Sequence, residues 1–361
     1  MRICLICSGF SSVYGGVEEV VFKLGKLWAE NGHEVWVISG RGKKTGPRGV
    51  RLIRLPFIPR KYIPRIPLIE KIFPDHELEG FSLVPSAFLC LMRVKPDIVL
   101  SNQIGETSPS LFLGIPTIMI SQAALKTRFN YFRKVDRVIV NDLFSFEQLK
   151  VVGIKSELIL NGSGITNIPK IDLEMRAKYS IPIDSKVILT VARLYSIKRI
   201  HLLIDAFKLI TEPATLIIIG DGPERALLEK RALEKNSKNR VIFLKGLPER
   251  ELHGLYQLCD VFTLPSKIEG LPLVVIDALS FGKTVVTNIA PEKKFILGKF
   301  GVFTDVNDPI EYSKALLRAG SIKIDVNSTE YINHMRKFNW NDIAAQYEEI
   351  FYDILEKHHS T

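Results

Sequence analysis

Short apolar runs alternate with segments of helical periodicity along almost the whole chain of 361 residues. Residues 2–8 form the first such run, and Val20, Leu24 and Trp28 then recur at the spacing of one helical face. Parallel strands that are buried on both faces have continuous apolar sequences, and each needs a crossover helix to reach its neighbour. The alternation therefore predicts an α/β fold with parallel sheets that helices cover on both faces.

The alternation stops once and then starts again. The turn-rich segment at residues 161–169 separates the two stretches, which predicts two doubly wound domains at residues 1–165 and 166–338. A helix at residues 341–357 closes the chain, within a third segment at residues 339–361. Strands are predicted at residues 2–8, 34–39, 51–55, 97–100, 117–121, 137–141 and 157–160, and after the turn-rich segment at 186–192, 215–220, 241–244, 261–264 and 284–287. Helices are predicted between the later strands, at residues 197–210, 224–234, 249–258 and 271–281.

The cysteines and the charge limit the class of protein. Cys4 and Cys7 have the spacing of a redox pair, but residues three apart on a strand point to opposite faces. Four cysteines without a disulfide framework indicate a reducing, cytoplasmic location. The net charge is +10, and residues 41–65 carry nine basic residues and no acid, which indicates an anionic partner. No recognition motif supports a nucleic acid as that partner.

A pair of glycines, Gly15 and Gly16, lies between the first predicted strand and the first helix. Glycines at this point let the backbone approach a phosphate, and the helix start supplies free N–H groups and a partial positive charge. A simple turn is the alternative. The segment lacks the G-x-G-x-x-G pattern of dinucleotide-binding proteins, which disfavours a dehydrogenase.

Two cations follow the first strand of the second domain. Arg193 comes directly after the strand, and Lys198 lies near the start of the next predicted helix. Cations at the carboxyl edge of a sheet are well placed to hold a diphosphate, with charge-assisted hydrogen bonds of roughly 1.5–3 kcal/mol each. The alternative is an exposed pair on a basic protein.

Two acids belong to a later loop and helix. Glu269 follows the predicted strand at residues 261–264, and Asp277 lies in the second turn of the next helix within an apolar stretch. Because an acid in such surroundings needs a polar partner, the vicinal hydroxyls of a ribose suit Asp277. Acids near a helix start are also common for reasons of the helix dipole alone.

The order and spacing of these motifs resemble the glycosyltransferases of family 4, which have the GT-B fold of two Rossmann-like domains facing a central cleft. The resemblance covers nearly the whole chain. The matching motifs are Gly15-Gly16-Val-Glu, Asn161-Gly, Arg193-Leu with Lys198, Gly220-Asp-Gly-Pro223, Leu255-Tyr before Cys259-Asp260, Leu264-Pro-Ser266, Glu269-Gly and Gly282-Lys-Thr-Val-Val286.

The resemblance implies roles for the motif residues. Residues like Arg193 and Lys198 hold the donor diphosphate, one like Glu269 contacts the sugar, and one like Asp277 contacts the ribose. It also implies that backbone near Gly15 and Gly16 approaches the donor, as does the segment Gly270, Leu271, Pro272 and Leu273. The N-terminal domain would bind the acceptor, the C-terminal domain the nucleotide sugar, and the last helix would cross back onto the first domain.

The chain departs from the family pattern at two places. The second acid is Asp277 where the family has Glu, so its side chain is one methylene shorter. Ser121 and Gln122 stand where many members have a sugar-contacting His. No Asp-x-Asp metal motif is present, which predicts transfer without a metal or other cofactor. The resemblance implies retention at the anomeric carbon, and the donor is expected to be a UDP- or GDP-sugar.

The acceptor is the least constrained part of the hypothesis. Residues 57–74 mix Phe, Ile, Tyr and Leu with basic residues, as in segments that lie on an anionic bilayer. A lipid-linked acceptor or cell-surface glycan precursor at the cytoplasmic face of the membrane fits this, while a basic loop packed by its own prolines is the alternative. Two other functions stay open, namely a nucleotide-sugar epimerase of the same fold and a catalytically inactive partner subunit.

Overall fold

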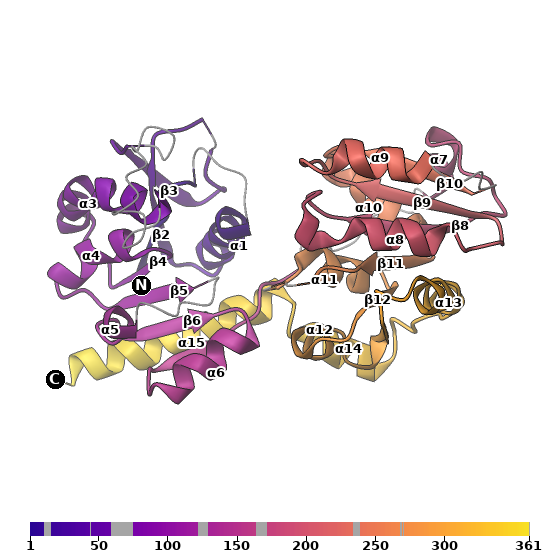
Figure 1. Cartoon of the computed structure of the whole chain (residues 1–361). Coiled ribbons are helices and arrows are strands. Elements are labelled where there is room, and N and C mark those ends of the chain that lie inside the picture. Colours follow the sequence, from indigo (N-terminus) through magenta and orange to yellow (C-terminus); the bar gives the residue numbers. More distant parts are fainter. Residues whose placement is uncertain are drawn as a thin grey trace. The chain divides into compact units, whose positions relative to one another are not determined.

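The computed structural model describes residues 1–10, 16–43, 45–58, 75–121, 129–163, 172–233, 239–267, 269 and 271–360. The chain forms two compact units (Figure 1). Unit 1 comprises Met1–Asn161 together with Asn339–Thr361, and unit 2 comprises Gly162–Phe338. The last segment of the chain is therefore part of the first unit.

Unit 1 contains a sheet of seven parallel strands in the order β3-β2-β1-β4-β5-β6-β7. The strands are β1 (Arg2–Ile6), β2 (Glu34–Gly40), β3 (Val50–Leu55), β4 (Ile98–Ser101), β5 (Thr117–Ser121), β6 (Arg137–Val140) and β7 (Ser156–Leu158). The described helices of this unit are α1 (Gly16–Glu30), α3 (Asp75–Val94), α4 (Ile104–Phe112), α5 (Phe129–Phe132), α6 (Leu143–Val151) and α15 (Trp340–His359).

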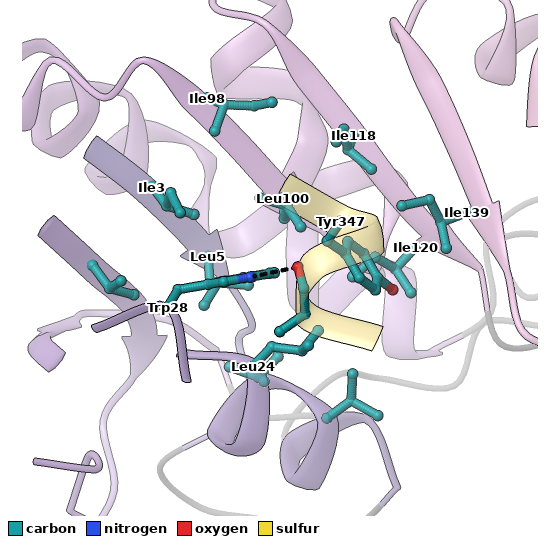
Figure 2. Packing of buried hydrophobic residues seen from close by; sticks show 14 of the residues in the cluster. Ile3, Leu5, Leu24, Trp28, Ile98, Leu100, Ile118, Ile120, Ile139 and Tyr347 are labelled. Carbon is teal, nitrogen blue, oxygen red and sulfur yellow. Dashed lines mark hydrogen bonds between the residues drawn. The ribbon is translucent and has the colours of Figure 1, made fainter. Parts of the chain in front are cut away.

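Helix α15 completes the core of unit 1. In Figure 1 the yellow α15 lies with the indigo and magenta elements of that unit. Trp28 of α1 is fully buried, its indole N–H donates to the carbonyl of Ala344 at 3.3 Å, and its ring meets Tyr347 and Phe351 edge-on. Figure 2 shows Trp28 and Tyr347 among side chains of the central strands, such as Leu5. The aromatic residues of α15 thus cover a sheet face that would otherwise meet water.

Unit 2 repeats the same topology with six parallel strands in the order β10-β9-β8-β11-β12-β13. The strands are β8 (Lys186–Val191), β9 (Ala214–Ile219), β10 (Arg240–Leu244), β11 (Val261–Leu264), β12 (Thr284–Asn288) and β13 (Gly301–Thr304). The described helices are α7 (Asp172–Lys178), α8 (Ile200–Phe207), α9 (Arg225–Leu233), α10 (Glu249–Leu258), α11 (Leu273–Ser280), α12 (Pro291–Leu297), α13 (Pro309–Ala319) and α14 (Thr329–Arg336), with short 3-10 turns η2 (Ser196–Lys198) and η3 (Gly298–Phe300).

Local sequence signals set several helix starts. Asp308 accepts hydrogen bonds from the amides of Ile310 and Glu311, and Pro309 occupies the first position of α13, where its missing N–H costs nothing. Asn339 caps α15 in the same way. These side chains satisfy backbone donors that a helix start leaves without partners.

The predicted α/β class with two parallel sheets is confirmed. Strands β5 and β11 have the predicted bounds, while β13 and several helices, including α3 and α12, were not predicted. All four cysteines are free and buried. Cys4 and Cys7 pack in clusters on opposite faces of the sheet, and burial raises the pKa of both thiols, so a redox pair is excluded. The central cleft stays a prediction.

Candidate active site

The order of the strands in unit 2 defines where a ligand can enter. The chain leaves β8 toward β9 and leaves β11 toward β12, on opposite sides of the pair that these two central strands form. The chain therefore diverges after these two strands, and it is beyond the carboxyl ends of strands at such a point that open α/β sheets bind ligands. Arg193 and Lys198 follow β8, and Glu269 follows β11.

The segment between β8 and the next α-helix is longer than predicted and contains a separate turn. The helix expected at residues 197–210 is divided, because Arg199 has a left-handed backbone conformation with φ 54°. Residues Ser196–Lys198 form the 3-10 turn η2, and α8 begins only at Ile200. The prediction was thus wrong at the start of the helix, and Lys198 lies on a separate turn that the backbone amide of Lys198 closes by donating to the carbonyl of Tyr195 at 2.9 Å.

Two glycines of the Gly220-Asp-Gly-Pro223 motif pack against the backbone of this loop. A Cβ atom on Gly220 would lie 1.9 Å from the carbonyl oxygen of Ala192, and one on Gly222 would lie 2.5 Å from that of Leu194. The amide of Leu194 also donates to the carbonyl of Asp221 at 2.9 Å. Only glycine allows so close an approach, so the motif fixes the backbone on both sides of Arg193.

The Arg193 side chain is exposed at this edge of the sheet. Its guanidinium carbon lies 5.5 Å from the centre of the Tyr195 ring, within the range of a cation–π contact. It forms no ion pair with any residue that the structure describes. The charge of Arg193 is therefore available to an external anion.

Lys198 and Glu269, by contrast, are paired with each other. Their Nζ and Oε1 atoms are 2.6 Å apart, and the two side chains are only 19% and 11% exposed. The amide of Lys267 donates to the carbonyl of Ile197 at 3.0 Å and so joins the loop after β11 to the turn after β8. The structure thus brings together two residues that sequence analysis had assigned to different parts of the donor.

A third cation of this site was missed in the sequence. Lys293 of α12 is 1% exposed, and its ammonium donates to the carbonyl of Ser266 at 2.7 Å and to the side-chain oxygen of Asn288. Burial lowers the pKa of Lys293 to about 8, against the opposing influence of Glu269. Lysine is almost never fully buried without partners, and the two oxygen acceptors supply them here.

Helix α11 begins beside the Glu269 loop. Pro272 is its N-cap, Leu273 is its first residue, and no side chain caps its free amides. Asp277 lies in the second turn and accepts a hydrogen bond from the hydroxyl of Ser163 at 3.0 Å, so its partner here is a hydroxyl group. Leu271 directly precedes the N-cap, while Gly270 lies outside the described residues.

In unit 1, α1 begins at Gly16, whereas Gly15 lies outside the described residues. The buried carboxylate of Glu106 accepts from the amide of Ser8 at 2.6 Å and from that of Asn102 at 3.3 Å. It therefore joins the loops that follow β1 and β4, the two strands where the order of this sheet reverses. Ser121 ends β5 and is buried.

Comparison with known families decides the class of protein. The model for glycosyl transferases group 1 matches residues 172–331, and the model for glycosyltransferase family 4 matches residues 14–162. The chain belongs to the family 4 glycosyltransferases. The two models together span most of both units, and the Arg193, Lys198 and Glu269 loops lie within the first of them.

Individual relatives agree with this family. A lipopolysaccharide core biosynthesis glycosyltransferase of Rhizobium meliloti is 26% identical over 311 residues, which are 84% of each chain. Among solved structures, sucrose-phosphate synthase from Thermosynechococcus elongatus has a TM-score of 0.77 at 19% identity and covers 99% of each chain. The Anabaena protein HepE, in complex with UDP and glucose, has a TM-score of 0.66 at 19% identity over the full length of both chains. These likenesses confirm the GT-B fold for this glycosyltransferase.

The structure also bears on the membrane. Among the described residues, no helix is long and apolar enough to cross a bilayer. The basic segment at residues 57–74, for which peripheral contact with a membrane was predicted, lies outside the described residues from position 59 onward.

Proposed function

We propose that this glycosyltransferase transfers a sugar from a UDP- or GDP-sugar to a lipid-linked acceptor or cell-surface glycan precursor, with retention of anomeric configuration. The observation that carries the proposal is the gathering of Arg193, Lys198 and Glu269 at the carboxyl ends of β8 and β11. Two basic side chains beside a single carboxylate suit a diphosphate attached to a sugar. The HepE complex with UDP and glucose, and the lipopolysaccharide relative, support this choice of donor and acceptor.

Departure of the nucleoside diphosphate leaves negative charge on its outer phosphate. Cations that are already in place where this charge develops lower the barrier without reorganisation. We assign this role to Arg193 and Lys198, with the backbone amide of Gly16 as a further donor. Glu269 would contact the hydroxyls of the transferred sugar, and Asp277 those of the ribose.

For retention, we propose that the acceptor hydroxyl attacks on the same face that the diphosphate leaves. The departing phosphate oxygen takes the acceptor proton, so that one C–O bond breaks and another forms on one side of the ring. A retaining hydrolase would instead place a second carboxylate opposite the leaving group. The proposal requires no metal ion, and turnover that persists in excess EDTA would support this part.

The first test is calorimetric titration of the purified protein with UDP, GDP and ADP. We expect one nucleotide to bind without added metal, and the Arg193→Ala variant to bind it about ten- to a hundredfold more weakly, as expected for one charge-assisted contact. Arg318→Ala is the matched control, because Arg318 is an exposed arginine on α13 of the same unit. Unchanged affinity in a folded Arg193→Ala protein would refute the assignment.

A second assay separates transfer from the alternatives. The nucleotide sugar that binds is incubated with and without membrane extract, and the sugar products are identified. Transfer requires the extract, whereas an epimerase releases an altered sugar without it. A protein that binds the nucleotide but gives no product under either condition would favour an inactive partner subunit.

A further inference from the structure

Lys293 holds the loop that carries Glu269 by a direct contact. Its ammonium binds the carbonyl of Ser266, three residues before Glu269. The preceding carbonyl, that of Pro265, accepts from the guanidinium of Arg199 at 2.8 Å. Two successive carbonyls of the loop are therefore each held by a cation from a different element.

The charges around Lys293 come from three parts of unit 2. Glu269 on the loop after β11 and Glu292 on α12 favour the ammonium, and Glu269 has the larger effect. Arg199 and Lys198, from the turn after β8, oppose it. The largest influence is burial itself, which lowers the pKa of Lys293 to about 8 from 10.5. The protonation state of Lys293 is therefore sensitive to any change in these few charges.

In the ligand-free protein Glu269 already has a close partner, since Lys198 lies 2.6 Å away. The donor diphosphate, in the function proposed above, draws Lys198 toward its phosphate oxygens. One ammonium group cannot hold both anions at its best geometry, so Glu269 loses part of its pairing when the donor binds. A carboxylate that is 11% exposed is costly without a partner.

We propose that Lys293 is a positioning residue for Glu269, the reserve counter-ion that keeps this carboxylate paired and in place when Lys198 turns to the diphosphate. The inference rests on the proposed function, because it assumes a diphosphate at the β8 loop. Lys293 itself does not contact the substrate. It affects the binding of the sugar only by positioning Glu269, through the Ser266 carbonyl and through its charge.

Proton uptake follows from this role. Both the added diphosphate and the freed Glu269 favour the ammonium form of Lys293, so donor binding raises its pKa. At pH 8.5 a group with a pKa of about 8 is roughly one-quarter protonated, and full protonation on binding takes up about three-quarters of a proton. A purely structural lysine, whose charge is indifferent to the ligand, would take up none.

The test is calorimetric titration of UDP or GDP at pH 8.5 in two buffers with different ionisation enthalpies, which gives the number of protons taken up. Wild type is expected to take up about three-quarters of a proton per nucleotide. Lys293→Met, which keeps the length of the side chain without its charge, is expected to take up none. Lys294→Met is the matched control, because Lys294 is the exposed neighbour on the same helix and should behave as wild type.

A second measurement needs no nucleotide. Lys198→Met removes the ion-pair partner of Glu269, and Lys293→Met removes the ammonium that holds the Ser266 carbonyl and favours the Glu269 charge. The double variant removes both. The double variant should therefore melt at a lower temperature than the sum of the single shifts predicts, while Lys198→Met combined with Lys294→Met should be additive.

The outcomes separate the two proposals. Failure of every nucleotide to bind a folded wild type would refute the donor function, and the melting temperatures alone would then decide whether Lys293 supports Glu269 when Lys198 is absent. Binding with equal proton uptake in wild type and Lys293→Met would overturn the reserve counter-ion. Additive melting shifts in the double variant would overturn it as well.

Discussion

Replacing Phe351 by alanine should destabilise unit 1 selectively. Phe351 is completely buried, and its ring centre lies 5.1 Å from that of Trp28 and 6.3 Å from that of Tyr347. Truncation of a buried phenylalanine to alanine removes about 3–5 kcal/mol of stability, through lost transfer free energy and the cavity that remains. In a unit of this size, about 2–4 °C is lost per kcal/mol, so the melting temperature should fall by roughly 10 °C.

The chain offers a specific assay for this change. All three tryptophans, Trp28, Trp36 and Trp340, lie in unit 1, so tryptophan fluorescence during urea denaturation follows that unit alone. Tyr352→Ala is the control, because Tyr352 is the next residue on the same helix and is 53% exposed. A loss below about 1 kcal/mol for Phe351→Ala, or an equal loss for both variants, would show that α15 does not complete the core as described.

Two further predictions concern unit 2. Gly220→Ala places a Cβ atom 1.9 Å from the carbonyl oxygen of Ala192 at a φ of +146°, so it should cost about 3 kcal/mol in urea denaturation and weaken nucleotide binding. Gly246→Ala, where a Cβ would meet nothing within 4 Å, should change neither stability nor nucleotide binding. Equal effects of the two substitutions would show that the close approach of Gly220 to the Ala192 carbonyl does not fix the loop after β8. The pKa of Lys293 is about 8 in the folded state and 10.5 in an unfolded chain. Between these two pH values the unfolded state binds more protons than the folded state. The stability of wild type therefore rises with pH in this range. Relative to Lys293→Met the gain should reach about 3 kcal/mol, and parallel pH profiles of the two proteins would refute it.

The sequence could predict the central strands because they are buried on both faces. A run such as that of β5, which is buried at every position, needs no partner to be recognised. Strand β13 was missed because it is only four residues long and begins with a glycine, so its apolar run is just Val302 and Phe303. Helix α3 was missed as well, and it contains Pro85, which argues against a helix in sequence.

The site was predictable where charges follow strands and not elsewhere. Arg193 and Glu269 could be found because each comes just after an apolar run. Lys293 follows a glutamate and precedes another lysine, which is typical of a solvated surface. A usable signal existed, since Ile296 and Leu297 lie three and four positions later and both are buried, so Lys293 lies on the apolar face of α12. The pairing of Lys198 with Glu269 depends on two loops 71 positions apart and had no local signal.

The chain enters unit 2 after Asn161 and returns to unit 1 at Asn339, so unit 2 is an insertion within the sequence of unit 1. The two crossing points are adjacent, because the amide of Ser163 donates to the carbonyl of Phe338 at 2.9 Å. During synthesis, unit 2 is complete once residue 338 has emerged from the ribosome. Most of unit 1 is made first, but its core is incomplete until Phe351 and its neighbours on α15 have been made. A nascent or C-terminally truncated chain would therefore expose the apolar surface around Trp28 and depend on chaperones for longer than the order of its domains suggests.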